Sequence, residues 1–472
     1  MMKDGTSRRD LLKLFGLGAA SLFLSACEGH TSVGPLRAQA RPLATAPPII
    51  LIVVDSLRSD HVSANGYLRS TTPNLDAWIA SQGASFRNAT SPSPWTFPAN
   101  AAMMTGRSPF QVGANWDSRS LPAAVAVLPE YLHAAGYYTA GFSANSWLSA
   151  SKSFGRGFDL YDDSVAFNPG SYRGFAGALN THVVDWLNAW NPPTQTQPLF
   201  LFLYYMDPHT WYYPPAPYDT LYDPDYTGPL TAEVYRDGQD VVGGLIVPTE
   251  RDIEHLLALY DGEISYCDDQ LGQLLGTLQG YGLLDDALVV VTSDHGQAFG
   301  EHNKWTHGSC LYEEVLRVPF MARYPGIIAP GQAITAPVQN MDLMPTILDW
   351  SGISIPPDLQ AVSLRPLLEG TTWPATRDLF SEADGITDPS HWHYWLGPYE
   401  DLYSVRRDAW KYIHHVDNVA ADELFQLNAG SVYETDNLIQ AEPVLAAELR
   451  QAVVDWFRLP HARNYLPFVS RG

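Results

Sequence analysis

The stretch Ile49-Ile50-Leu51-Ile52-Val53-Val54, followed at once by Asp55, decides the fold class. An unbroken run of aliphatic and β-branched residues is typical of a strand that is buried on both faces. Two more runs of this kind cover Leu199–Tyr205 and Leu288–Thr292. Strands buried on both faces belong to sheets that are covered by helices on each side.

Helical patterns lie between these runs, and the longest covers residues 251–279 and ends at Gly280 and Gly282. Strands that alternate with helices predict an α/β fold with a mostly parallel central sheet flanked by helices on both faces. Ligands of such sheets bind beyond the carboxyl ends of the strands. Polar residues stand at that end of all three runs, at Asp55, Asp207 and Asp294.

A turn-rich stretch over residues 369–374 places a domain boundary near residue 370. We expect a catalytic domain over residues 48–370 and a smaller C-terminal α+β lobe over residues 371–472. The lobe is predicted from three short strands and a terminal helix, over residues 402–406, 410–413, 424–427 and 443–457.

The pattern of the first 27 residues predicts an export signal. Residues 7–13 have the twin-arginine pattern, an apolar run covers residues 14–24, and Leu24-Ser25-Ala26-Cys27 resembles a bacterial lipobox. We therefore expect residues 1–27 to be a signal peptide with lipidation at Cys27, and residues 28–47 to be a flexible tether. A cleaved signal with a chance cysteine, or a membrane helix, are the alternatives.

The composition limits the classes of partner. The chain has 472 residues, 46% of them hydrophobic, and 28 Lys and Arg against 51 Asp and Glu give a net charge of −23. This acidity argues against nucleic acid as a partner, but local cations or a metal ion still allow a small anionic substrate. Besides Cys27, the chain has Cys267 and Cys310, which are too few for a disulfide scaffold or a thiolate metal site.

Three residues at the predicted strand ends form a candidate cation site. Asp55 follows one strand, and Asp294 and His295 follow another, with Gly296 allowing a tight turn. Two carboxylates and an imidazole together suit a divalent cation. Each residue alone would more often be a cap or a turn residue.

Thr96 stands at or just before the start of a predicted helix in which Pro98 suits the first turn and Gly106 the end. A hydroxyl at this place is ordinarily an N-cap. The functional alternative is a nucleophile that a neighbouring metal ion activates.

These segments, taken in order, resemble the sulfatase family of the alkaline phosphatase superfamily. The matching stretches are residues 54–61, 72–76, 95–98, 105–106, 206–209, 259–264, 292–296, 301–302, 307–308, 311–314, 410–412 and 423–427. The resemblance covers about residues 48–457 and implies the fold of that superfamily and metal-centred ester hydrolysis.

The resemblance also implies residue roles. Asp55, Asp294 and His295 match metal ligands, and Thr96 matches the nucleophile that the metal contacts. His209 matches a histidine that faces the substrate.

His307 and Lys304 lie in the region that supplies a cationic group to the bound ester. We expect His209 and His307 to act in catalysis and, with Lys304, in substrate binding. Packing of His209 among aromatic residues and a solvated Lys304 are the structural alternatives.

The chain departs from the family pattern at the nucleophile. Family sulfatases have Cys or Ser there, oxidised to formylglycine, with Pro two and Arg four residues later; this chain has Thr96, Pro98 and Asn100. Oxidation of a secondary alcohol cannot give that aldehyde, so no formylglycine is expected. Ser56 replaces a carboxylate found in many sulfatases. The site is then less negative, and Mn²⁺ or Zn²⁺ becomes competitive with Ca²⁺ as the single divalent cation.

The sequence thus predicts an exported periplasmic or cell-surface lipoprotein, anchored to the membrane at Cys27, that hydrolyses an anionic ester through Thr96. The substrate is expected to be a phosphate or sulfate ester on a glycan, a lipid headgroup or a small metabolite. The resemblance implies a phosphate ester first, since superfamily relatives with an unmodified Thr act on phosphate esters or transfer phospho-groups. Two alternatives stay open: a sulfuric ester hydrolase without formylglycine, and a catalytically silent lipoprotein that binds an anionic glycan.

Overall fold

The computed structural model describes residues 46–118, 120–167, 175–230, 241, 245–371, 373, 376–386, 400–427 and 434–457. They belong to one compact unit, Ala40–Gly472. The predicted signal peptide with Cys27 and nearly all of the predicted tether lie outside the described residues. Among the described helices, none is both long and apolar enough to span a bilayer. Cys267 and Cys310 are free thiols, and both are buried.

Within the described residues a central sheet of nine strands has the order β10-β2-β9-β6-β1-β5-β3-β4, with β11 paired to β2. Strand β9 runs antiparallel to its neighbours β2 and β6, and the other described pairs of this sheet are parallel. The bounds are β1 Ile49–Val54, β2 Ala84–Thr90, β3 Tyr138–Ser143, β4 Leu160–Asp162, β5 Leu199–Tyr205, β6 Leu288–Thr292, β9 Arg317–Arg323, β10 Gln332–Ile334 and β11 Val338–Gln339.

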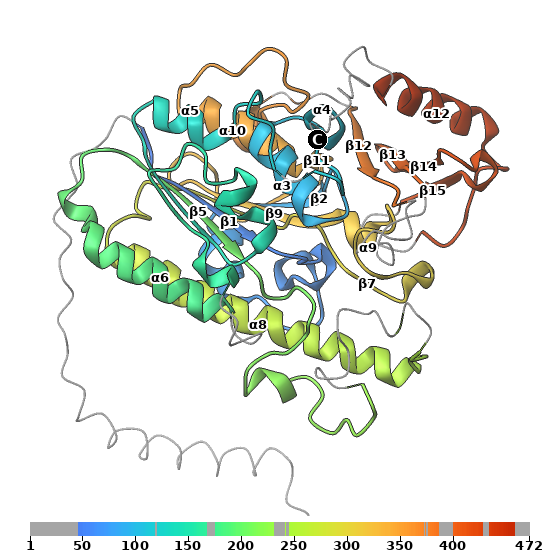
Figure 1. Ribbon diagram of the computed structural model, residues 1–472, viewed down its shortest axis with the longest axis horizontal. Coiled ribbons are helices and arrows are strands. Elements are labelled where there is room, and N and C mark those ends of the chain that lie inside the picture. Colours follow the sequence, from blue (N-terminus) through green and yellow to red (C-terminus); the bar gives the residue numbers. More distant parts are fainter. Residues whose placement is uncertain are drawn as a thin grey trace, which may run out of the picture. The chain divides into compact units, whose positions relative to one another are not determined.

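Alternate residues of β1 enter two different cores because successive side chains of a strand point to opposite faces. Ile50, Ile52 and Val54 join the core under α6 (Phe175–Trp190) and α8 (Glu250–Gly280). Ile49, Leu51 and Val53 join the core under α3 (Thr96–Thr105), α5 (Leu128–Ala134) and α10 (Leu343–Trp350). In Figure 1 these two groups of helices cover opposite faces of the sheet.

The predicted α/β architecture is therefore confirmed. The three apolar runs are the central strands β1, β5 and β6, and the predicted helix over residues 251–279 is α8. Strands β5 and β6 pair with β1 on either side. Because these strands are parallel and adjacent, their carboxyl ends meet at one edge of the sheet.

The C-terminal lobe is an antiparallel sheet with the strand order β12-β13-β14-β15, covered by helix α12 (Figure 1). One face packs against α12, and the other packs against residues of the segment 298–316 of the catalytic domain. The predicted α+β lobe is confirmed. The bounds are β12 Asp378–Ala383, β13 Leu402–Arg407, β14 Trp410–His415, β15 Glu423–Gln426 and α12 Pro443–Phe457.

A long excursion, residues 293–316, connects β6 to β9. It contains the hairpin of β7 (Ala298–Phe299) and β8 (Trp305–Thr306) and the short helix α9 (Glu313–Leu316). Further short α-helices are α2 Pro73–Leu75, α4 Pro109–Val112 and α11 Arg365–Leu368.

Candidate metal centre and active site

Asp55, Asp294 and His295 come together at the carboxyl edge of the sheet. Asp55 follows β1 and the other two follow β6, the strand paired with β1. One ligand atom from each residue lies within 4.8 Å of the others, and all three side chains are fully buried. In the described part of the chain this is the cluster of His, Cys, Asp or Glu that could hold a metal ion.

The imidazole of His295 is oriented for ligation. Its Nδ1 donates to the carbonyl oxygen of Gly296 at 2.9 Å, because a carbonyl can only accept. Its Nε2 faces the carboxylates, 3.6 Å from Asp55 Oδ1 and 3.5 Å from Asp294 Oδ2. A neutral imidazole of this tautomer presents a lone pair to the cluster.

Two buried carboxylates next to one another need a compensating positive charge. Burial, and then the charge of Asp294, raise the pKa of Asp55 to about 7. Hydrogen bonds to Asp55 from Ser56 Oγ (2.9 Å) and Asn145 Nδ2 (2.7 Å) act in the opposite direction. The set of donors, two carboxylates and an imidazole, therefore fits a divalent cation.

Asp294 is held by groups from three other segments. Tyr204, at the end of β5, donates its hydroxyl to Asp294 Oδ2 at 2.6 Å, and Asn100 Nδ2 donates to the same oxygen at 3.1 Å. The backbone N–H of Ser56 donates to Oδ1 at 3.3 Å. Burial, and then Asp294, raise the pKa of Tyr204 well above its usual range, so its hydroxyl keeps its proton.

Sequence analysis did not identify Tyr204 and Asn145 as part of the site. Their signal is positional: each stands at the carboxyl end of its strand, Tyr204 in β5 and Asn145 two residues after β3. These strands lie next to β1 and next to β5.

Thr96 lies at the cluster. It is the first residue of α3, and the N-cap position belongs to Trp95, which makes no side-chain capping hydrogen bond. Thr96 is therefore not the helix cap that a hydroxyl at this place would usually be. Its Oγ1 lies 3.3 Å from His295 Nε2. The backbone carbonyl of Thr96 accepts from Asn100 Nδ2 at 2.9 Å, so Asn100 joins the helix start to Asp294.

His209 and His307 lie beside this cluster. The ring of His307 is 4.3 Å from that of His295 and 4.9 Å from that of His209, between ring centroids. His209 Nδ1 donates to the carbonyl oxygen of Thr210 at 2.6 Å. This bond fixes its tautomer and leaves Nε2 as the nitrogen that can exchange a proton.

Gln297 fixes the other histidine, and sequence analysis missed this residue. Its Nε2 donates to Thr210 Oγ1 at 2.9 Å and to the Tyr212 hydroxyl, so its Oε1 faces His307 Nδ1 at 2.7 Å and accepts from it. Gln297 is fully buried, directly after the Asp294-His295-Gly296 motif and directly before β7. The sequence points to Gln297 only through its position directly after that motif.

Lys304 lies in the turn that precedes β8 and is half-buried. The described residues that line the cavity at Thr96 do not include it. Its role as a cation for the substrate stays a prediction.

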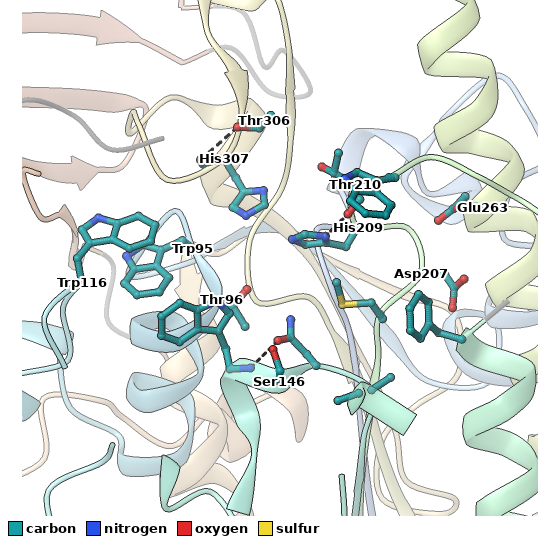
Figure 2. Close-up of a pocket in the computed structure, with 17 residues that line it drawn as sticks. Trp95, Thr96, Trp116, Ser146, Asp207, His209, Thr210, Glu263, Thr306 and His307 are labelled. Carbon is teal, nitrogen blue, oxygen red and sulfur yellow. Dashed lines mark hydrogen bonds between the residues drawn. The ribbon is translucent and has the colours of Figure 1, made fainter. Parts of the chain in front are cut away.

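A cavity of about 320 Å³ opens at Thr96 and is lined by His209 and His307 (Figure 2). Much of its remaining wall is aromatic, formed by Trp95, Trp116, Trp147, Phe175 and Trp211. The cavity thus brings a hydroxyl and two imidazoles together, and Thr96 connects it to the candidate cation site.

The fold and this site at the edge of the sheet define a sulfatase-like ester hydrolase. The family model "Sulfatase" matches residues 47–353, and the model of the C-terminal part of N-sulphoglucosamine sulphohydrolase matches residues 300–455. The chain therefore belongs to the sulfatase family, as the resemblance of its motifs predicts.

Several relatives extend over most of the chain. An arylsulfatase of Clostridium perfringens is 28% identical over 69% of this chain and 80% of its own length. A choline-sulfatase of Rhizobium meliloti is 27% identical over 84% of this chain and 82% of its own length. Among solved structures, a phosphonate monoester hydrolase of Silicibacter pomeroyi shares the fold, with a TM-score of 0.68 and 24% identity over 87% of this chain and 94% of that one.

Proposed function

We propose that this protein is an exported hydrolase of an anionic ester that depends on a divalent cation and uses Thr96 as its nucleophile. The observation that carries this proposal is the position of the Thr96 hydroxyl, 3.3 Å from the nitrogen of His295 that also faces Asp55 and Asp294. An inherited but silent site would not need to keep a hydroxyl at that point.

Asp55, Asp294 and His295 would hold the cation, with Thr96 beside it. When bound, a Ca²⁺, Mn²⁺ or Zn²⁺ ion supplies polarisation of the ester oxygens and lowers the pKa of a neighbouring hydroxyl. The protein's own part is to place and orient the reacting groups.

In the reaction, Thr96 Oγ1 releases its proton to solvent and forms a bond to the phosphorus or sulfur atom while the bond to the leaving oxygen breaks. The leaving oxygen takes a proton from Nε2 of His209 or His307. Water then attacks the same centre and gives a proton back to the Nε2 of that histidine, the bond to Thr96 breaks, and the Thr96 oxygen takes a proton from solvent. Both histidines suit proton transfer because each has its Nδ1 fixed by an acceptor.

Phosphate esters are the first expectation because Thr96 cannot become formylglycine. The names of relatives, an arylsulfatase and a choline-sulfatase, favour sulfate esters as the second candidate. The test uses the chain without residues 1–27 and compares an aryl phosphate, an aryl phosphodiester and an aryl sulfate with each cation in turn. Failure to hydrolyse any of them would leave a silent anion-binding lipoprotein as the better account.

Removal of the cation is expected to abolish turnover. Treatment with EDTA should reduce the rate by at least about tenfold, and Mn²⁺, Zn²⁺ or Ca²⁺ should restore it. In the Asp294→Asn protein, which loses a carboxylate of the cluster, restoration should need a much higher concentration of the ion. Asp286→Asn, an exposed position before β6, is the control. A full rate in EDTA would contradict the metal site.

The Gln297→Leu change is expected to lower kcat about tenfold, by the loss of a group that orients a catalytic residue. Without the amide acceptor, His307 loses the bond that fixes its tautomer. Gln297→Glu should retain the acceptor and move the alkaline limb of the pH–rate profile upward, because a carboxylate raises the pKa of a neighbouring imidazole. Unchanged pH profiles in both variants would show that His307 does not exchange the proton.

We also propose that acylation of Cys27 anchors the mature protein to a bacterial membrane after twin-arginine export. The support is the sequence of residues 7–27. Labelling with a radioactive fatty acid is expected to mark the wild type and not Cys27→Ser, and the variant should appear in the soluble fraction. Labelling of both proteins would exclude Cys27 as the acylated residue.

A further inference from the structure

The cavity beside Thr96 has an unusual composition for a site that receives an anionic ester. Four tryptophans line it, Trp95, Trp116, Trp147 and Trp211. Of the described lining residues none is Lys or Arg. A substrate with several sulfate or phosphate groups would therefore meet no lysine or arginine side chain among these lining residues.

Three of the tryptophans pack into one rigid group. Trp95 and Trp116 stack with ring centroids 3.8 Å apart and planes 4° from parallel. Trp147 meets Trp95 edge-on at 5.3 Å and 81°. The ammonium of Lys152 lies 4.2 Å from the centroid of the Trp147 ring, so this wall already attracts a cation from outside the cavity lining.

Two carboxyl groups, Asp207 and Glu263, line the same cavity (Figure 2). Both residues are only 3% exposed. The backbone N–H groups of Ala176 and Tyr213 hold them in place, at 2.7 Å from Asp207 Oδ2 and at 2.6 Å from Glu263 Oε1. Burial, and then Asp207, raise the pKa of Glu263 well above its usual range, and burial raises that of Asp207 to about 6.

Burial disfavours the charged form of these carboxyl groups, and a cation beside them would stabilise that form. Aromatic faces add to the same preference, since the negative face of a tryptophan ring attracts a cation. We propose that the alcohol released from the ester carries a substituted ammonium group, which binds in this cavity between the tryptophans and the carboxyl groups of Asp207 and Glu263. This inference rests on the proposed function for the ester itself, but it concerns the leaving group alone.

Binding of the alcohol tests the inference without turnover. Calorimetry would compare 2-(trimethylammonio)ethanol with its neutral isostere 3,3-dimethylbutanol on the whole mature protein. The ammonium alcohol is expected to bind about tenfold more tightly. Glu263→Gln keeps an acceptor for Tyr213 and removes the charge, so the preference should fall close to one. Glu254→Gln, on the same helix but with a side chain 69% exposed, should keep it.

Hydrolysis rates of different esters distinguish a failure of this inference from a failure of the proposed function. The phosphate and sulfate esters of the two alcohols would be compared with a 4-nitrophenyl ester, and kcat/KM for the ammonium ester is expected to exceed that for the neutral one by about tenfold. Equal binding of both alcohols, or binding of neither, would overturn the inference. Hydrolysis of the 4-nitrophenyl ester in that case would leave the proposed function intact.

Discussion

Thr96→Ala is expected to reduce hydrolysis of an aryl ester by at least about a hundredfold, as for the loss of a covalent nucleophile. The variant keeps α3 and its packing, because the Thr96 side chain makes no helix-capping bond. It loses the one hydroxyl that lies 3.3 Å from His295 Nε2. The measurement is kcat at saturating substrate with the cation that gives the highest rate.

Two controls make this result specific. Thr96→Ser retains a hydroxyl and should retain a measurable rate. Thr105→Ala removes a buried hydroxyl from the other end of the same helix, where it donates to the carbonyl oxygen of Ala101, and should leave kcat unchanged. Mass spectrometry of the wild-type peptide containing Thr96 should show no oxidation. A Thr96→Ala protein with wild-type kcat would overturn the mechanism and leave the fold unaffected.

Lys411→Met is expected to lower the free energy of unfolding by about 3–5 kcal/mol, the range for breaking a buried ion pair. Lys411 belongs to β14 of the C-terminal lobe, and its Nζ lies 2.9 Å from Glu313 Oε1 in α9 and 2.9 Å from Glu434 Oε1. All three side chains are at most 2% exposed. The change removes the buried cation that the two acidic groups share, although Glu313 keeps Arg406, whose Nη1 lies 3.4 Å from its Oε2.

The pKa shifts agree with this role. Burial disfavours the charged form of Lys411, but Glu313 and Glu434 outweigh burial and raise its pKa. Burial also disfavours the charged form of Glu313, but the charges of Lys411 and then Arg406 outweigh burial and lower the pKa of Glu313 to about 2. The stability is measured by urea unfolding. Arg407→Met, on the neighbouring strand, removes a cation that is 28% exposed and should cost less than about 1 kcal/mol. Equal effects of the two changes would contradict a special role for Lys411.

The central fold could be predicted because it depends on local patterns. The runs Ile49–Val54 and Leu288–Thr292 are apolar on both faces, and this alone identifies them as inner strands of a covered sheet. Helix α8 has a regular apolar stripe, and its first turn is closed by a capping box of Thr249 and Asp252. No sequence pattern predicts that β9 runs antiparallel to its neighbours, because the direction of a strand is set by its connection and not by its own residues.

The candidate site could be predicted in part. Asp55, Asp294 and His295 stand at the ends of recognisable strands, so parallel pairing brings them together. Gln297, Tyr204 and Asn145 belong to none of the motifs that the sequence shows, and their positions after or near strand ends gain a meaning only once the pairing of the strands is known. The same holds for the aromatic wall, whose tryptophans come from four separate segments of the chain.

The reversed strand β9 begins at the edge where β1, β5 and β6 end. Residues 293–316 thus leave the sheet and re-enter it at the same edge. A connection between two parallel strands must instead return along the full length of the strands to the opposite edge. A connection of this kind does not fix the register of the strands that it joins, although residues 298–316 also pack against the C-terminal lobe. This segment carries His295, Gln297 and His307, so a change in its shape would move groups of the site while the strands of the sheet stay in place.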